Sequence, residues 1–259
     1  MKLAVTGKGG TGKTTVACIL AHYFKNDGYQ VLTVDADPDA NLASALGIPA
    51  EQASSIIPIS QQRQLIEERT GAKYRQFGQL LKLNPTVNDI ADRYGLSFQG
   101  IRLLVMGGVQ KGGDGCACPE NVLLRSLLSE IILNRDEVVI VDMEAGIEHL
   151  GRATARSIDK MLITVEPGSR SILTAKTIIK LGQEIGVEEF GIVGNKIQDQ
   201  TQEQWIIQQF SQSQILGMVS YHENIQEADL KQQPLMEVLD NKLRKEFDKI
   251  YYGCCQKNE

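Results

Sequence analysis

Residues 7–15, Gly-Lys-Gly-Gly-Thr-Gly-Lys-Thr-Thr, constrain this chain more than any other segment. They fit the pattern G-x-x-x-x-G-K-[ST], in which a glycine-rich turn joins a strand to a helix. An apolar run at 3–6 precedes them, and an amphipathic helical pattern follows. Glycines let consecutive backbone N–H groups surround phosphate oxygens, and the helix N-terminus adds partial positive charge. We therefore expect a phosphate-binding loop whose nucleotide-binding residues include Gly9, Gly10, Thr11, Gly12, Lys13, Thr14 and Thr15.

Short apolar segments along the chain predict an α/β fold with a mostly parallel, twisted sheet. They are rich in β-branched and aliphatic residues, which is typical of strands buried on both faces. Helical patterns lie between them, and in the first one Val16, Ile19, Leu20, Tyr23 and Phe24 form a single apolar stripe. Strands that alternate with helices favour parallel pairing with right-handed crossovers. We expect about seven strands, at 3–6, 31–34, 101–106, 138–141, 161–165, 191–194 and 215–219.

Two segments depart from this alternation, yet neither is expected to form a separate domain. Residues 48–98 are polar and compatible with helices, so they predict a helical insertion on the rim of the sheet, too polar for a core of its own. From Pro234 onward, apolar residues recur at helical spacing and predict a C-terminal helix over 234–252 that packs back on the sheet. Residues 1–259 are therefore expected to form one P-loop NTPase domain.

The charge balance disfavours some classes of partner. The chain has 27 Lys and Arg against 32 Asp and Glu, a net charge of -5. Because nucleic acids and anionic lipids attract a positive face, we expect neither nucleic acid nor a membrane as a partner. No apolar run approaches the ~18 residues that span a bilayer, and 3–6 leads into glycines without a signal peptide's apolar region, so we expect a cytoplasmic protein. There the five cysteines are candidates for metal or redox sites and not for a disulfide framework.

Lys8 is a second lysine in the phosphate-binding loop. Two ammonium groups this close repel each other unless a polyanion neutralises them. With Lys8 as well as Lys13, the loop resembles the deviant Walker A motif of the superfamily that contains MinD, ParA and the nitrogenase iron protein. The resemblance implies an ATPase in which Lys8 crosses a nucleotide-sandwich homodimer to the partner's phosphates, so that ATP controls dimerisation.

Acidic residues follow the second expected strand, in the stretch Asp-Ala-Asp-Pro-Asp-Ala-Asn at 35–41. Carboxylates at the carboxyl ends of such strands lie near the phosphate loop, where they orient a water molecule or support Mg²⁺. The family resemblance implies that Asp37 activates the attacking water, which makes Lys8, Lys13 and Asp37 the catalytic residues. A loop that only caps the next helix is the alternative for Asp37, and more strongly for Asp39. Asp35 and Asn41 are weaker candidates.

A second carboxylate, Asp142, ends the apolar strand at 138–141 in the arrangement that holds Mg²⁺ through water. Lys13 reaches the terminal phosphates in such sites, and a hydroxyl at the position of Thr14 ligates the ion. We therefore expect Thr14, Asp37 and Asp142 to serve Mg²⁺. Residues 144–151 resemble the switch II segment of the superfamily, in which a glycine lets the backbone move with the γ-phosphate.

Asn195 and Lys196 end another expected strand. In the family an Asn at this place reads the adenine base, and an amide offers the donor and acceptor that adenine's edge needs. Both residues are therefore nucleotide-binding candidates. A simple turn former is the alternative for Asn195.

Cys116 and Cys118 lie in a glycine-rich stretch after the third expected strand. Two cysteines at this spacing do not readily form an unstrained disulfide, and they supply two ligands where tetrahedral zinc or a thiolate-held cluster needs four. If two chains meet at this loop, four thiolates converge, and metal binding is coupled to dimerisation. Pro119 predicts a helix start that lowers the pKa of the Cys118 thiol. Two inert loop cysteines are the alternative.

Three segments together give a closer resemblance. Three stretches, Gly-Cys-Ala-Cys-Pro-Glu-Asn at 115–121, Asp-Ala-Asp-Pro-Asp-Ala-Asn-Leu-Ala at 35–43 and Asp-Met-Glu-Ala-Gly-Ile-Glu-His-Leu-Gly at 142–151, are similar to the CooC-type ATPases that mature carbon monoxide dehydrogenase. The similarity runs from Lys2 to about Leu235. It implies ATP or ADP with Mg²⁺ as cofactors, Ni²⁺ or Zn²⁺ bound by the Cys-x-Cys pairs of a homodimer, and nickel delivery to the apoenzyme.

Two other functions remain open at this level. Four thiolates at a dimer interface could also hold an iron–sulfur cluster, as in a carrier or reductase of the nitrogenase-iron-protein type. A positioning ATPase of the MinD/ParA type is the other alternative, although the basic residues of the tail are interleaved with acidic ones. Cys18 and His22 are expected on the exposed face of the first helix, where two ligands alone rarely hold a metal.

Overall fold

One sheet organises the computed structural model, which describes residues 1–73, 79–107, 118–144, 150–231 and 233–256. The order of the strands across the sheet is β3-β4-β2-β5-β1-β6-β7-β8. The central strands β1, β2, β5 and β6 are buried along their whole length, as their continuous apolar sequences predict. The strands are β1 (Lys2–Gly7), β2 (Val31–Asp35), β3 (Leu96–Phe98), β4 (Ile101–Val105), β5 (Val138–Asp142), β6 (Lys160–Val165), β7 (Phe190–Ile197) and β8 (Ile215–Ser220).

The mostly parallel sheet confirms the predicted fold class, but it has eight strands and not about seven. The additional strand is β3, which pairs antiparallel with β4 at the edge of the sheet. A two-residue turn joins them, and both of its residues, Gln99 and Gly100, have positive φ. This is the tight hairpin turn whose twist matches that of the flanking strands. The sequence does not predict β3, because its three residues lie within a polar segment and are half-buried or exposed, which leaves little periodic signal.

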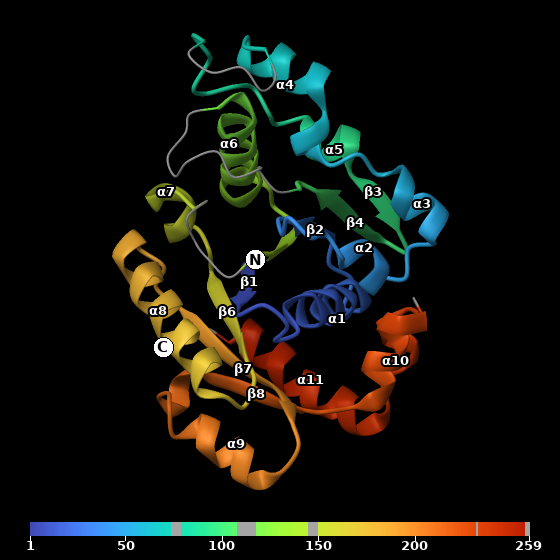
Figure 1. Ribbon diagram of the computed structural model, residues 1–259, viewed down its shortest axis with the longest axis vertical. Coiled ribbons are helices and arrows are strands. Elements are labelled where there is room, and N and C mark those ends of the chain that lie inside the picture. The colour runs from blue at the N-terminus through green and yellow to red at the C-terminus, as the bar shows by residue number, and fades with distance from the viewer. Residues whose placement is uncertain (74–78, 108–117, 145–149, 232, 257–259) are drawn as a thin grey trace.

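Helices cover both faces of the sheet (Figure 1). On one face α1, α2 and α11 bury their apolar side chains in a single cluster, and on the other face α4, α6 and α8 do the same. Successive residues of β1 serve opposite faces, with Ala4 in one cluster and Leu3 and Val5 in the other. The helices are α1 (Lys13–Asn26), α2 (Leu42–Ala45), α3 (Ala50–Ser55), α4 (Arg63–Thr70), α5 (Ile90–Tyr94), α6 (Pro119–Asn134), α7 (Arg152–Arg156), α8 (Ser169–Ile185), α9 (Gln200–Ile207), α10 (Glu223–Lys231) and α11 (Asn241–Cys255), with 3-10 turns η1 (Ile59–Gln61), η2 (Gln212–Gln214) and η3 (Leu235–Glu237).

The segment expected as an insertion at 48–98 contains α3, η1, α4, α5 and β3. Its buried residues Ile59, Leu65, Ile66 and Ile90 join the cluster that includes α6 and the central strands. The insertion therefore shares the core of the sheet instead of forming one of its own, and it covers one side of α6 (Figure 1).

Two helices differ from their predicted form. The C-terminal segment begins with η3, and α11 starts only after Asp240, whose Oδ1 accepts a hydrogen bond from Leu243 N at 2.8 Å and caps the helix. On α1, Cys18 and His22 are buried, so their predicted exposure is wrong. The helix α1 lies between the sheet on one side and α2, η3 and α11 on the other. These elements bury the face of α1 that lies outside its predicted apolar stripe.

In the part of the chain that the structure describes, no helix is both long and apolar enough to cross a membrane.

Candidate nucleotide site

The loop between β1 and α1 has the backbone of a phosphate-binding turn. Gly12 precedes α1 with φ of 91°, a left-handed conformation that glycine adopts without strain. Gly7 ends β1 with φ of 147°, and a Cβ atom there would lie 2.4 Å from the Thr164 carbonyl oxygen. Glycine is required at both positions, as the motif predicts.

Two threonines fix the base of this loop. The Oγ1 hydroxyl of Thr11 donates to the Lys8 carbonyl at 2.8 Å, and it lies 2.7 Å from Thr164 Oγ1 on β6. Both threonines are fully buried. The motif predicts Thr11 but not Thr164, because the proximity of Thr164 follows from the pairing of β6 with β1.

The first turn of α1 brings a lysine and a hydroxyl to the acidic ends of two neighbouring strands. Lys13 Nζ is 3.8 Å from Asp37 Oδ2, and Thr14 Oγ1 donates to Asp142 Oδ2 at 2.6 Å. Asp35 and Asp142 are direct register partners at the ends of β2 and β5. The structure therefore gathers Lys13, Thr14, Asp37 and Asp142 at one edge of the sheet, while Thr15 follows in the same helical turn.

Burial changes the protonation of the two strand-end carboxyls. Loss of hydration raises the pKa of Asp142 to about 7, against the opposing effect of the Thr14 hydrogen bond, and raises the pKa of Asp35 to about 6. Asp142 Oδ1 is also buried, and no described residue gives it a hydrogen bond. A buried carboxylate oxygen without a partner beside a threonine hydroxyl suits Mg²⁺, a hard cation that prefers oxygen ligands and retains several waters.

Asp35 contributes more to the site than the sequence predicts. Its Oδ2 accepts a hydrogen bond from Leu42 N at 2.9 Å and its Oδ1 accepts one from Asp37 N at 3.3 Å. Asp37 in turn accepts from Asp39 N at 3.0 Å, and Asn41 donates to the Asp39 carbonyl at 2.7 Å. Asp35 therefore holds the acidic loop in place, whereas the exposed Asp39 and Asn41 shape it locally.

Lys8 lies at the surface of the site with its ammonium 3.3 Å from Glu166 Oε1. Glu166 directly follows β6, the strand beside β1, so the two groups meet across neighbouring strand ends. Glu166 is not among the residues predicted from the sequence. A carboxylate after a strand was the available signal, but the order of strands in the sheet was needed to place it.

The carboxyl end of β7 also contacts the phosphate-binding loop. Asn195 Nδ2 donates to the Thr11 carbonyl at 2.8 Å, and Lys196 Nζ donates to the Gly10 carbonyl at 2.6 Å. Asn195 is buried, whereas Gly9 and Gly10 are exposed. All the predicted nucleotide-binding residues thus lie in or against one loop.

The predicted metal pair is described only in part. Cys118 directly precedes Pro119, the first residue of α6, as predicted, and is half-buried. Cys116 and residues 145–149 of the predicted switch II lie outside the described residues. Within the described ranges no group of three or more His, Cys, Asp or Glu side chains could hold a metal ion.

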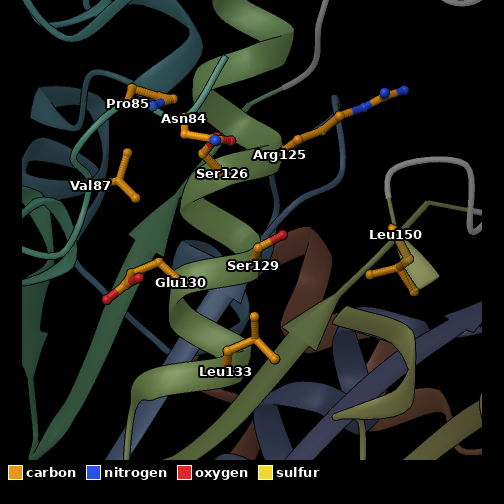
Figure 2. Close-up of a pocket in the computed structure, with 10 residues that line it drawn as sticks. Asn84, Pro85, Val87, Arg125, Ser126, Ser129, Glu130, Leu133 and Leu150 are labelled. Atoms are coloured by element: carbon orange, nitrogen blue, oxygen red, sulfur yellow. The ribbon is translucent and has the colours of Figure 1, made fainter. Parts of the chain in front are cut away.

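A hollow of about 360 Å³ lies apart from this site, between the insertion, α6 and the start of α7 (Figure 2). Figure 2 shows Ser126, Ser129 and Leu133 on α6, with Asn84 and Val87 on one side and Leu150 on the other. The predicted catalytic and nucleotide-binding residues are not among those that line it.

The glycine-rich loop, the adjoining lysine and hydroxyl, and the two strand-end carboxylates define a P-loop nucleotide-binding protein. Comparison with known families agrees with this class. The chain belongs to the family of the CobQ/CobB/MinD/ParA nucleotide binding domain, whose model matches residues 2–235.

Two relatives are similar over most of their length. The chain is 45% identical over 253 residues to an uncharacterized ATP-binding protein of Methanocaldococcus jannaschii, covering 97% of this chain and 96% of the relative. It is also 45% identical over 229 residues to the carbon monoxide dehydrogenase accessory protein CooC of Rhodospirillum rubrum, covering 88% of this chain and 87% of CooC. This similarity confirms the resemblance found in the motifs.

Solved structures agree with the fold. The chain resembles a chain of the MinC:MinD cell division protein complex of Aquifex aeolicus with a TM-score of 0.69 at 18% identity, covering 100% of this chain and 97% of that one. It resembles MinD of Pyrococcus horikoshii, solved with Mg-ADP, with a TM-score of 0.66 at 21% identity, covering 96% and 93%. At these identities the likeness establishes the fold alone.

Proposed function

We propose that this chain is an ATP-dependent metallochaperone. Its homodimer binds nickel, or zinc in its place, through Cys116 and Cys118 of both protomers, and it delivers nickel to the active-site cluster of a carbon monoxide dehydrogenase apoenzyme. The similarity to CooC is the observation that carries this proposal, because it spans 88% of the chain at 45% identity. The Cys-x-Cys pair directly before α6 supplies chemistry suited to a soft or borderline metal ion.

ATP hydrolysis in this proposal depends on residues gathered around the phosphate loop. Lys13 binds the terminal phosphates, Asp37 orients water toward the γ-phosphorus, and the products are ADP and inorganic phosphate. Thr14 and Asp142 would hold Mg²⁺, which supplies positive charge to the phosphates when bound. Lys8 contacts the nucleotide of the partner subunit, which links hydrolysis to the state of the dimer.

The metal site in this proposal needs two copies of the chain. Each protomer contributes two thiolates, and four complete a site at the dimer interface. The position of Cys118 before the N-terminus of α6 favours the thiolate, because the helix end carries partial positive charge. Metal binding releases the thiol protons, so affinity is expected to rise with pH.

An anaerobic Ni²⁺ titration tests the proposal. The wild-type protein and the double variant Cys116→Ala/Cys118→Ala are titrated by calorimetry, and their masses are measured by size-exclusion chromatography with light scattering. We expect one nickel ion per wild-type dimer and no tight binding by the variant. Cys255→Ala, which removes an exposed thiol on α11, is the matched control and should bind as the wild type does.

Nickel delivery is tested by a second measurement. The nickel-loaded dimer is mixed with nickel-free carbon monoxide dehydrogenase and ATP, and the activity of the dehydrogenase is followed. We expect activation of the dehydrogenase that the double cysteine variant fails to support. Cysteine-independent nickel binding would contradict the metal site, and a loaded dimer that leaves the dehydrogenase inactive would contradict the client.

A further inference from the structure

Thr164, near the end of β6, contacts the phosphate-binding loop at both of its ends. It is the register partner of Gly7, and a Cβ atom on Gly7 would lie 2.4 Å from the Thr164 carbonyl oxygen and 2.6 Å from Thr164 Oγ1. Thr164 Oγ1 also lies 3.3 Å from the Thr6 carbonyl oxygen and 2.7 Å from Thr11 Oγ1. One side chain therefore touches the residues where the loop leaves β1 and the residue where it returns toward α1.

The hydroxyl groups of Thr164 and Thr11 form a chain of hydrogen bonds with a fixed direction. A hydroxyl has a single hydrogen to donate. Thr11 donates its hydrogen to the Lys8 carbonyl at 2.8 Å, so Thr164 must be the donor in the contact of 2.7 Å between the two hydroxyls. Both threonines are fully buried, so bulk water cannot replace a donor that is lost there.

The Lys8 carbonyl closes a tight turn over residues 8–11. It accepts a hydrogen bond from Thr11 N at 3.2 Å as well as the one from the Thr11 hydroxyl. Gly10, the third residue of this turn, has φ of 82°, which is the value that a type II turn requires there. Gly9 and Gly10 are exposed, whereas Thr11 is buried. The backbone of Lys8 is therefore fixed at the buried base of the turn.

Lys8 is thus held in different ways at its two ends. Its carbonyl accepts buried, uncharged hydrogen bonds that lead through Thr11 to β6, whereas its ammonium has only the partly exposed ion pair with Glu166 at 3.3 Å. Ion pairs at a protein surface contribute little to stability. The backbone of Lys8 can therefore stay in place while its side chain leaves Glu166 for another anion.

We propose that Thr164 is a positioning residue for dimerisation. Through Thr11 it holds the turn of residues 8–11, so that Lys8 extends from a fixed backbone toward the nucleotide of a second copy of this chain. The inference rests on the crossing role of Lys8 in the proposed function and deepens it. A turn that is already ordered in the single chain loses less conformational freedom when the dimer forms, so loss of the Thr164 hydroxyl should weaken dimerisation.

Two substitutions separate the hydroxyl of Thr164 from the packing of its side chain. Thr164→Val keeps the branched shape and removes the hydroxyl, whereas Thr164→Ser keeps the hydroxyl and removes a methyl group. Dimerisation of each protein is measured by light scattering over a range of protein concentrations, with Mg²⁺ and a saturating non-hydrolysable ATP analogue. Thermal unfolding of the nucleotide-free proteins measures their stability.

Thr164→Val should raise the dissociation constant of the dimer. One net hydrogen bond changes an equilibrium by about threefold to tenfold. A symmetric dimer contains two such turns, so the constant should rise by about tenfold to hundredfold. An unchanged constant in Thr164→Val would overturn the inference.

Thr164→Ser should dimerise nearly as the wild type does, although the lost methyl group leaves a small cavity and should lower the Tm. A merely structural role for Thr164 predicts instead that dimerisation follows the Tm of each variant. Dimerisation that falls with the Tm in Thr164→Ser would overturn the inference.

Thr11→Val provides an independent test of the route, because it removes the hydroxyl that joins Thr164 to the Lys8 carbonyl. If Thr164 acts through Thr11, Thr164→Val should add little to the loss of dimerisation that Thr11→Val already causes. Full additivity of the two losses would overturn the route through Thr11.

The wild-type measurement separates this inference from the proposed function. A wild-type protein that stays monomeric with the ATP analogue would contradict the proposed dimer and the inference with it. A wild-type protein that dimerises, beside a Thr164→Val variant that dimerises equally well, would overturn the inference alone.

Discussion

At the scale of single residues, Asp142 connects three parts of the site. It ends β5, it accepts the Thr14 hydroxyl from α1, and it is the register partner of Asp35 on β2. Its second carboxylate oxygen is buried and without a hydrogen bond from any described residue. The unfavourable burial of this carboxyl is consistent with a position made for a cation.

Replacing Asp142 by Asn should therefore affect Mg²⁺ and leave the local fold in place. The Asn carbonyl can still accept the Thr14 hydroxyl, but it carries no charge. We expect ADP affinity in Mg²⁺ to fall at least tenfold, as is usual when a group that holds a metal through water is lost, with little change in EDTA. Titration of both proteins under the two conditions measures this, and an unchanged dependence on Mg²⁺ would exclude the role of Asp142.

His22 gives a prediction about pH. Burial on α1, together with the charge of Lys25, lowers its pKa below the ordinary value of about 6.5. Below that value the unfolded chain binds a proton that the folded protein resists, so the free energy of unfolding falls as pH falls. We expect His22→Gln to lose less stability than the wild type between pH 8 and pH 5, as measured by thermal unfolding.

The comparison between the two proteins is needed because other buried groups titrate in the same interval. Asp35 and Asp142 have raised pKa values, so the folded protein takes up their protons and gains stability on acidification. Both proteins share this contribution, and it cancels in the difference. Identical pH profiles for His22→Gln and the wild type would show that His22 is not the group responsible.

At the scale of elements, the site exists because parallel strands end at one edge. β1, β2, β5, β6 and β7 each deliver residues there, and their helices return along the two faces of the sheet. The C-terminal helix α11 packs in the same core as α1. Its residues Leu243, Phe247 and Ile250 are buried in one cluster with Val16 and Leu20 of α1.

Phe247→Ala should show how much the sheet depends on α11. The ring is 1% exposed, and truncation of a buried Phe removes apolar contacts and leaves a cavity at a cost of about 3–5 kcal/mol. For a chain of this size we expect a Tm lower by roughly 10 °C in calorimetry. Tyr252→Ala removes a ring on the same helix that is 62% exposed, and it should lower the Tm far less. Equal losses would mean that α11 does not pack as the structure has it.

At the scale of the whole molecule, Lys8 links the site to the proposed dimer. In the single chain its ammonium pairs with Glu166 at 3.3 Å, with 39% and 28% of the two side chains exposed. Exposed pairs of this kind contribute little to stability, about 0–1 kcal/mol, so Lys8 can leave Glu166 for a phosphate at little cost.

Lys8→Ala should therefore bind ATP but fail to dimerise with it. Light scattering in the presence of ATP and Mg²⁺ should give a dimer for the wild type and a monomer for the variant. Glu166→Gln, which removes the intramolecular partner but keeps Lys8, should dimerise as the wild type does, with a Tm within about 2 °C of it. A Lys8→Ala protein that dimerises normally would refute the crossing role of this lysine.

Several elements could be predicted because their signals are local. The loop 7–15 specifies its own turn through its glycines, and the seven predicted strands are short apolar runs of the kind that parallel sheets contain. The features that could not be predicted share one physical cause, which is their dependence on contacts between distant parts of the chain. β3 is a short edge strand that depends on its partner, and the burial of Cys18 and His22 depends on elements that pack against α1 from distant parts of the chain.

The phosphate-binding loop, the carboxylates that follow the strands and the class of fold could be predicted from the sequence, because each follows from residue types at fixed local spacing. Which strand ends are neighbours is set by the order of the strands in the folded sheet. That order brings Thr164 and Glu166 to the loop from β6, brings Asn195 and Lys196 from β7, and makes Asp35 and Asp142 register partners. Such contacts join residues far apart in the chain, and burial and strand pairing select them only when the whole sheet forms.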